Sequence, residues 1–403
     1  MDRDEPLGLE PVESLQVERL EAERLGRVEG RCLFATYQWG KSRRKREEGQ
    51  NSPIDKLLKR LSPDPWIGKL KKSPSSLRKY ELCKALFRYL FIMYVPSYLQ
   101  LYKEGQLLKR AEKATNLLKK CSLCPRQCAV DRLNNEKGVC QTGTRAKVAS
   151  YNAHFGEEAP LVGRFGSGTI FFSFCNLRCS FCQNYEISHL GEGIEMEAKD
   201  LAAIMIALQN KGCHNINLVT PTHVVPQILE ALLLAVEHGL HIPIVYNSGG
   251  YERVKTLKLL EGIIDIYMPD FKFWDKKWAD RYCSASDYGE IAIRAFKEMY
   301  AQVGDLTIDK NGIAERGLLV RHLVMPHEIA GTKDIMEFLS KEISYNTYVN
   351  VMDQYRPCGT AYQDEYLNNR ISVEEYSMAL KWAHNAGLKR LDQRQGRRLL
   401  YQI

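Results

Sequence analysis

The feature that most constrains the fold of this 403-residue chain is a regular alternation of short β-rich runs and helical patterns after residue 146. Strands are predicted at residues 169–174, 215–219, 243–246, 264–268, 318–325 and 348–352. Helices are predicted between them at 199–211, 224–237, 253–260, 290–303 and 333–340. Parallel strands need crossover connections, usually helices, and right-handed crossovers curl the sheet. The alternation therefore predicts an α/β fold, a partial (β/α)6 barrel whose chemistry lies at the carboxyl ends of the strands.

The part of the chain before the predicted barrel divides into three stretches. Residues 1–76 combine an acidic start, a basic run at 43–46 and a Ser/Pro-rich composition, which predicts a poorly ordered extension. Residues 77–120 carry apolar side chains at helical spacing, with Pro96 as a break, and predict a helical leader. Residues 121–145 hold four cysteines, and residues 146–403 form the predicted barrel.

Composition argues against several classes of protein. Mean hydropathy is −0.35, and the most apolar run, residues 82–99, is interrupted by charged side chains and Pro96, so we expect no membrane-spanning helix. The start shows no signal or transit peptide pattern, which makes the cytoplasm the expected compartment. The net charge of +8 has much of its excess in the first third, which indicates a solvated basic face rather than a nucleic-acid partner. Twelve cysteines in such a chain indicate metal or sulfur chemistry.

Three cysteines follow the first predicted strand of the barrel at Cys-x3-Cys-x2-Cys spacing: Cys175, Cys179 and Cys182. Structural zinc normally takes four protein ligands, and no fourth Cys or His follows at finger spacing. A four-iron four-sulfur cluster held by three thiolates keeps one iron open for an exogenous ligand. A buried thiol cluster or a zinc knob is the simpler alternative, but the position at a strand end favours the open cluster.

This spacing, with Phe181 before the last cysteine, resembles the signature of radical S-adenosylmethionine (SAM) enzymes, which fold as partial (β/α)6 TIM-like barrels. The next segment, including Asn184, is similar to the pyruvate formate-lyase activating enzyme branch and its uncharacterised homologues. The similarity runs from about residue 98 to residue 391. The resemblance implies that Cys175, Cys179 and Cys182 hold a 4Fe-4S cluster whose open iron chelates SAM. It also implies cleavage of SAM by one electron to methionine and a 5'-deoxyadenosyl radical, which abstracts hydrogen from the substrate.

The next two predicted strands are followed by polar residues that the resemblance assigns to the cofactor. Thr220 and Thr222 stand where the family's Gly-Gly-Glu motif holds the amino group of SAM. The motif's carboxylate is missing here, and Thr222 as a helix N-cap is an equal alternative. Asn247 and Ser248, followed by two glycines, are similar to the Asp-Thr-Asn-Gly turn of the activating enzymes. Two glycines are also compatible with a plain tight turn.

The last three strands carry further candidates. Asp270 and Lys272 resemble the family's Asp-Leu-Lys segment, which implies contacts with SAM; a surface ion pair is the alternative. Arg321 lies among apolar residues of its strand and needs an anionic partner if buried. The resemblance places a matching arginine near the methionine carboxylate. Gln354 or Tyr355 stands where the activating enzymes have a histidine near the cofactor.

A second group of cysteines precedes the barrel and comprises Cys121, Cys124, Cys128 and Cys140. Four thiolates can close a coordination shell around structural zinc or an auxiliary iron-sulfur cluster, and spacing does not decide between them. A closed zinc site would anchor the leader on the barrel. A redox cluster would relay electrons to the first cluster or bind substrate.

The resemblance implies a radical SAM oxidoreductase that generates a glycyl radical on a protein partner, with an electron donor such as flavodoxin or ferredoxin. The departures at residues 220–223 and 247 leave room for a radical reaction on another protein, a peptide or a small molecule. An alternative of another class is a zinc-binding nucleic-acid module with a basic leader. The six βα units argue against this alternative, because such a module does not need them.

Overall fold

The structure is a computed structural model that describes residues 94–392. The predicted extension, residues 1–76, and the start of the predicted leader lie outside the described residues. Between residues 94 and 392 no helix is both long and apolar enough to cross a lipid bilayer.

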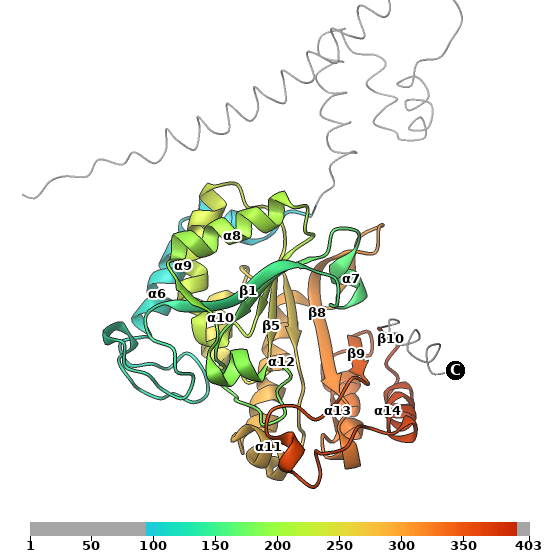
Figure 1. Cartoon of the computed structure of the whole chain (residues 1–403). Helices are drawn as coiled ribbons and strands as arrows, with labels where there is room; N and C mark the ends of the chain where they lie inside the picture. The colour runs from blue at the N-terminus through green and yellow to red at the C-terminus, as the bar shows by residue number, and fades with distance from the viewer. Residues whose placement is uncertain (1–93, 393–403) are drawn as a thin grey trace, which may run out of the picture. The chain divides into compact units, whose positions relative to one another are not determined.

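Within residues 94–392 the strands form one ten-stranded sheet at the centre of the fold (Figure 1). They are β1 (Ala146–His154), β2 (Ser167–Phe172), β3 (Ile194–Met196), β4 (Ile216–Val219), β5 (Ile244–Ser248), β6 (Ile266–Pro269), β7 (Thr307–Ile308), β8 (Ala314–Leu323), β9 (Tyr348–Met352) and β10 (Arg390–Leu391). The order is β10-β9-β8-β6-β5-β4-β2-β1-β3, with β7 also paired to β8. Neighbours from β2 to β10 run parallel, whereas β1 pairs antiparallel with β2 and β3. Since β3 and β10 do not pair, the sheet is open, which confirms the predicted α/β class and partial barrel.

The six predicted strands correspond to β2, β4, β5, β6, β8 and β9. The strands β1, β3, β7 and β10 were not predicted. The middle of β1 is exposed, so it lacks the continuous apolar pattern of a buried strand. The other three have only two or three residues each, too few to show a period.

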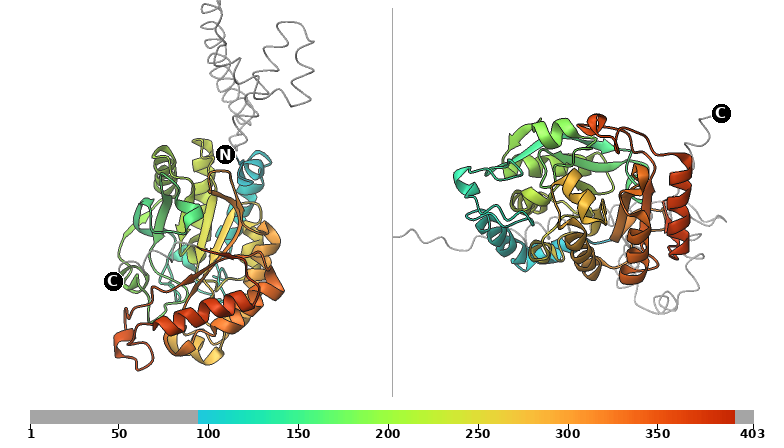
Figure 2. Two further views of the ribbon diagram at one scale, coloured as in Figure 1. Left: turned by 90° about the vertical axis from the view of Figure 1, so that its right-hand side faces the viewer. Right: turned by 90° about the horizontal axis from the view of Figure 1, so that it is seen from below.

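Helices cover the outer face of the parallel strands (Figures 1 and 2). The helices between residues 94 and 392 are α5 (Tyr98–Lys103), α6 (Gln106–Asn116), α7 (Ala159–Val162), α8 (Ala198–Asn210), α9 (Val225–Glu237), α10 (Val254–Leu260), α11 (Lys276–Cys283), α12 (Tyr288–Val303), α13 (Thr332–Phe338) and α14 (Val373–Asn385), and of these α7 lies at the edge of the sheet beside β1. Successive contacts join α8, α9, α6, α10 and α12, and α13 packs on α14. The predicted helices correspond to α8, α9, α10, α12 and α13, whereas α7, α11 and α14 were not predicted.

Helix α6, from the predicted leader, packs on both α9 and α10 within this layer. It begins after Gly105, whose left-handed φ of 66° turns the chain out of α5. Leu107, Ala111 and Ala114 are buried and repeat at helical spacing, so one face of α6 fills the layer. The Tyr98 hydroxyl donates to the Ile242 carbonyl (2.8 Å) and ties α5 to the end of the α9–β5 connection.

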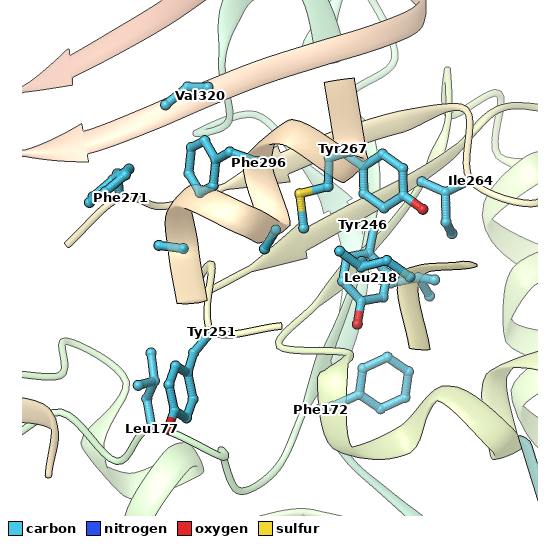
Figure 3. Packing of buried hydrophobic residues seen from close by; sticks show 14 of the residues in the cluster. Phe172, Leu177, Leu218, Tyr246, Tyr251, Ile264, Tyr267, Phe271, Phe296 and Val320 are labelled. Atoms are coloured by element: carbon cyan, nitrogen blue, oxygen red, sulfur yellow. The ribbon is translucent and has the colours of Figure 1, made fainter. Parts of the chain in front are cut away.

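The core between sheet and helices is rich in aromatic side chains (Figure 3). The ring centroids of Tyr246 and Tyr267 lie 5.8 Å apart, and those of Phe271 and Phe296 lie 5.1 Å apart. All four side chains are almost completely buried. Burying each such side chain contributes roughly 1.5–3 kcal/mol, and this packing fixes the strand ends that carry the site.

Candidate active site

A cavity of about 540 Å³ is lined by residues at the carboxyl ends of the parallel strands. Its lining includes Cys175 after β2, Thr220 after β4, Asn247 on β5, Asp270 after β6 and Gln354 after β9. The volume lies within the usual range of pockets for small ligands and cofactors. The topology thus brings residues from across nearly 180 positions of sequence around one space.

The three cysteines of the triplet all line this cavity. The Leu177 N–H donates to Cys175 Sγ (3.3 Å), and the Ser188 hydroxyl donates to Cys182 Sγ (3.2 Å). Phe174 and Arg178 adopt left-handed backbone conformations, with φ values of 67° and 58°. Such conformations cost energy in residues other than glycine and are common at functional sites.

The thiols of the triplet are held in their protonated form until a metal displaces the proton. Burial, with the neighbouring Cys179, raises the pKa of Cys175 to about 12. A hydrogen bond with Cys283, followed by burial, raises the pKa of Cys179, and burial raises that of Cys182. Metal binding by these thiols therefore releases protons and becomes weaker in acid.

Between residues 94 and 392 no three His, Cys, Asp or Glu side chains are arranged to hold a single metal ion. A 4Fe-4S cluster bonds each thiolate through a different iron atom, so its ligands are spread more widely than those of one ion. Three thiols around one cavity, Cys179 buried and Cys175 and Cys182 half-buried, fit such a cluster.

The loop of the triplet is held in place by groups that the sequence analysis did not identify. The Arg126 guanidinium donates to the carbonyl oxygens of Asn176 (2.9 Å), Leu177 (3.4 Å) and Cys283 (2.9 Å). The Cys283 thiol itself lies 3.2 Å from Cys179 Sγ. Arg126 belongs to the second cysteine segment, so that segment fastens the loop that carries the triplet.

Asp270 lies between two cations at the end of β6. Its carboxylate accepts from Lys272 Nζ at 2.6 Å and from Arg321 Nε at 2.7 Å. The three side chains are only 16–19% exposed, so the alternative of a surface ion pair is wrong. Burial works to raise the pKa of Asp270, but the charges of Arg321 and Lys272 outweigh it and hold the pKa below its usual value. Asp270 is thus the anionic partner that a buried Arg321 requires.

Arg321 is engaged by other oxygen atoms as well. Its Nη2 donates to Asn247 Oδ1 (2.7 Å), and its Nη1 lies 3.8 Å from Glu157 Oε2. Glu158 lies 4.0 Å from Nε. These two glutamates line the cavity and were not identified from the sequence. The predicted contact of Arg321 with the methionine carboxylate stays a prediction, because the guanidinium already faces protein oxygens.

The segment after β4 separates the two threonines of the prediction. Thr220 lines the cavity in a left-handed conformation, with φ of 60°, and its N–H donates to the Asn247 carbonyl (2.9 Å). Thr222 is buried, does not line the cavity and donates to Glu252 Oε1 (2.5 Å). It also gives no side-chain cap to the helices that follow. The structure therefore supports neither a contact of Thr222 with the cofactor nor its role as a helix N-cap. The sequence analysis did not identify Glu252 as its hydrogen-bond partner.

The remaining predicted residues lie as follows. Ser248, Lys272, Phe181 and Asn184 line the cavity, and so does Gln354. Tyr355 does not line it, because its hydroxyl donates to the Leu367 carbonyl (2.7 Å). Of the two alternatives at the end of β9, the structure therefore favours Gln354.

The second group of cysteines lies around a different and much smaller cavity. Its lining includes Cys121, Cys124, Cys128 and Cys140, together with Arg132 and His223. The two groups therefore do not share one cavity.

Comparison with known proteins agrees with this geometry. The sequence profile of the radical SAM superfamily matches residues 169–339, which include the triplet and the strand ends through Arg321. A protein of Methanocaldococcus jannaschii, "Uncharacterized protein MJ0674", is 33% identical over 305 residues, covering 72% of this chain and 82% of that protein. The superfamily implies a 4Fe-4S cluster, SAM and an enzyme with radical chemistry. The chain belongs to the radical SAM superfamily.

Proposed function

We propose that this radical SAM enzyme abstracts a hydrogen atom from a substrate bound in the cavity of the triplet. The proposal rests on one observation: the three thiols and the polar side chains of the successive strand ends share a single cavity. The likeness to activating enzymes suggests glycine Cα of a protein partner as the substrate, and a flavodoxin or ferredoxin as the electron donor.

A 4Fe-4S cluster held by Cys175, Cys179 and Cys182 would supply the electron for the reductive cleavage of SAM. The residues of the chain bind and orient the reactants. Lys272 uses one N–H on Asp270 and carries two more donors, which suit the carboxylate of the methionine moiety. The Asn247 side chain is oriented by Arg321 and faces the same cavity. Leu177 and Phe181 provide an apolar wall that keeps water from the reacting atoms.

A small-molecule substrate is a second candidate, favoured by contacts across the open side of the sheet. The segment after β1 belongs to one edge of the parallel strands, whereas β9 and the end of β10 belong to the other. Asn350 Nδ2 on β9 donates to Glu158 Oε1 (2.9 Å), and the Ala159 N–H donates to Asp392 Oδ2 (3.3 Å). These bonds bridge the two edges and leave less room for a loop of a folded partner.

The first experiment is an anaerobic assay. The reconstituted protein is reduced with dithionite or with reduced flavodoxin, SAM is added, and 5'-deoxyadenosine and methionine are measured. We expect product with the wild type and with Cys213→Ala, a buried thiol that lines neither cavity, but none with Cys179→Ala. Equal product from Cys179→Ala would refute the assignment of the triplet.

A second experiment separates the two substrate classes. Fractions of high and low molecular mass are prepared from deuterated cell extract, and deuterium in 5'-deoxyadenosine is measured by mass spectrometry. Deuterium transfer from the protein fraction supports a protein substrate, and transfer from the small-molecule fraction supports the second candidate. Transfer from neither fraction, with SAM cleaved, would contradict hydrogen abstraction from both.

A further inference from the structure

Four thiols of the segment after α6 gather around one small cavity. Cys121, Cys124 and Cys140 are buried, and Cys128 is half-buried. The chain folds back on itself here: the Cys121 N–H donates to the Val130 carbonyl (2.9 Å), and the Ala129 N–H donates to the Cys121 carbonyl (3.0 Å). The gathering is therefore built by backbone hydrogen bonds within the segment.

The Arg132 side chain shows that this cavity suits an anionic group. Arg132 is 1% exposed. Its described partners are the carbonyl oxygens of Gly143 (3.0 Å) and His223 (2.8 Å) and the sulfur of Cys121 (4.0 Å). No carboxylate is among these partners, and a buried guanidinium without an anion is strongly unfavourable. Thiolates bound to a metal supply the missing negative charge.

Other groups around the cavity are also arranged for sulfur ligands. The Val139 N–H points to Cys128 Sγ at 3.5 Å, a contact that stabilises thiolate ligands of iron-sulfur clusters. A Cβ at Gly138 would lie 2.7 Å from Cys128 Sγ, so only glycine leaves space for this sulfur. His223 lines the cavity, and its buried Nδ1 has no hydrogen-bond partner within the described residues.

Four thiolates can hold a single zinc ion or an iron-sulfur cluster, and either centre would supply the negative charge that Arg132 lacks. For the triplet the superfamily implies a 4Fe-4S cluster. A metal count distinguishes the two kinds of centre at the second group.

We propose that Cys121, Cys124, Cys128 and Cys140 hold a second 4Fe-4S cluster. All four irons of this cluster are bonded to protein thiolates, so it has no open position for SAM. Two sets of hydrogen bonds connect this segment to the triplet. In the first, Arg126 donates to the carbonyl oxygens of the triplet's loop. In the second, Arg132 donates to the His223 carbonyl, and His223 Nε2 donates to the carbonyl of Ser173, two residues before Cys175 (2.8 Å).

The test is a metal count with spectroscopy on the full chain. Anaerobically reconstituted wild type should contain about eight iron and eight sulfide per chain, and no zinc. The triple variant Cys175→Ala, Cys179→Ala, Cys182→Ala should keep about four iron, with a signal from the reduced cluster that SAM does not change. The double variant Cys124→Ala, Cys140→Ala should also keep about four iron, with a signal that SAM does change. Cys213→Ala serves as the matched control and should equal the wild type.

A wild type with about four iron and one zinc per chain would overturn the proposal, as would a folded triple variant without iron. If the double variant does not fold, Mössbauer spectra of the wild type decide. Since SAM binds one iron of the triplet's cluster, it should shift about one eighth of the iron signal, and a shift of about one quarter would refute the second cluster. The proposed function and the second cluster fail in different ways: if only the proposed function is wrong, the iron count still shows two clusters, but SAM is not cleaved.

Discussion

Replacing Asp270 with Asn tests whether the Lys272–Asp270–Arg321 group is a compensated buried charge cluster. The substitution keeps the size of the side chain but removes the only charge between two cations at 2.6 and 2.7 Å. Since these side chains are 16–19% exposed, Lys272 would remain largely shielded from water without its anion. Arg321 would keep the more distant Glu157 and Glu158, at 3.8 and 4.0 Å. Breaking a fully buried pair costs about 3–5 kcal/mol, and the partial exposure together with the glutamates beside Arg321 places the expected cost at the lower end, about 3 kcal/mol. Glu342→Gln is the matched control: Lys297 and Glu342 are also 2.6 Å apart but about half exposed, and the expected cost is below about 1 kcal/mol.

The assay is urea unfolding of the metal-free chain under anaerobic conditions. With a slope of about 3 kcal/mol per M, Asp270→Asn should lower the midpoint by about 1 M or more at pH 7, and Glu342→Gln by much less. The pKa of Asp270 is lowered in the folded chain, so its contribution is present at neutral pH and is lost as pH falls through that value. The difference between wild type and Asp270→Asn should therefore shrink below about pH 4. Equal, small effects of both substitutions at pH 7 would refute the reasoning.

Three further predictions concern the surroundings of the cavity. Arg126→Met removes the hydrogen bonds from the guanidinium to the carbonyl oxygens of the triplet's loop, which contribute about 1.5 kcal/mol net. A chelator should therefore remove iron from the triplet about tenfold faster than in the wild type. An unchanged rate of iron loss would contradict the role of Arg126 in holding the loop. Burial raises the pKa of Glu252 to about 7, so between about pH 5 and 7 the unfolded chain ionises while the folded chain does not, and the wild type should lose stability as the pH rises. The free energy of unfolding of Glu252→Gln relative to the wild type should therefore rise by about 1.4 kcal/mol per pH unit, measured by urea unfolding at pH about 5 and 7. A difference that does not change with pH would contradict the buried titration. Cys283→Ala should leave the iron of the triplet in place despite the contact with Cys179, and iron analysis showing its loss would make Cys283 a ligand.

The barrel could be predicted because buried parallel strands are continuous apolar runs that alternate with helices. Strand β1 could not, because it joins the sheet antiparallel with its middle exposed. Similarly, α14 is amphipathic enough to form but buries only Ala379 and Ala383 completely, so its sequence carries a weak signal.

The site was predictable where its signal is local or follows from the topology. The cysteine spacing is local, and Asp270 and Asn247 stand at strand ends that a barrel must bring together. Arg126 contacts the carbonyl of Cys283, 157 residues later, and the Cys283 thiol contacts Cys179, 104 residues earlier. Sequence spacing does not predict contacts over such separations. The placement of Thr222 depended on a carboxylate 30 residues later, which only the fold brings to it.

The position of α6 between α9 and α10 has a consequence for synthesis on the ribosome. Helix α6 is made before either of its neighbours, and α10 ends only at Leu260. At about 5–20 residues per second, roughly ten seconds pass before α10 has left the ribosome. For most of that interval, until α9 has also been made, the face of Leu107, Ala111 and Ala114 lacks both of these partners and can associate wrongly. Slow translation between residues 117 and 260 should therefore lower the yield of folded protein, whereas chaperones that cover nascent apolar helices should raise it.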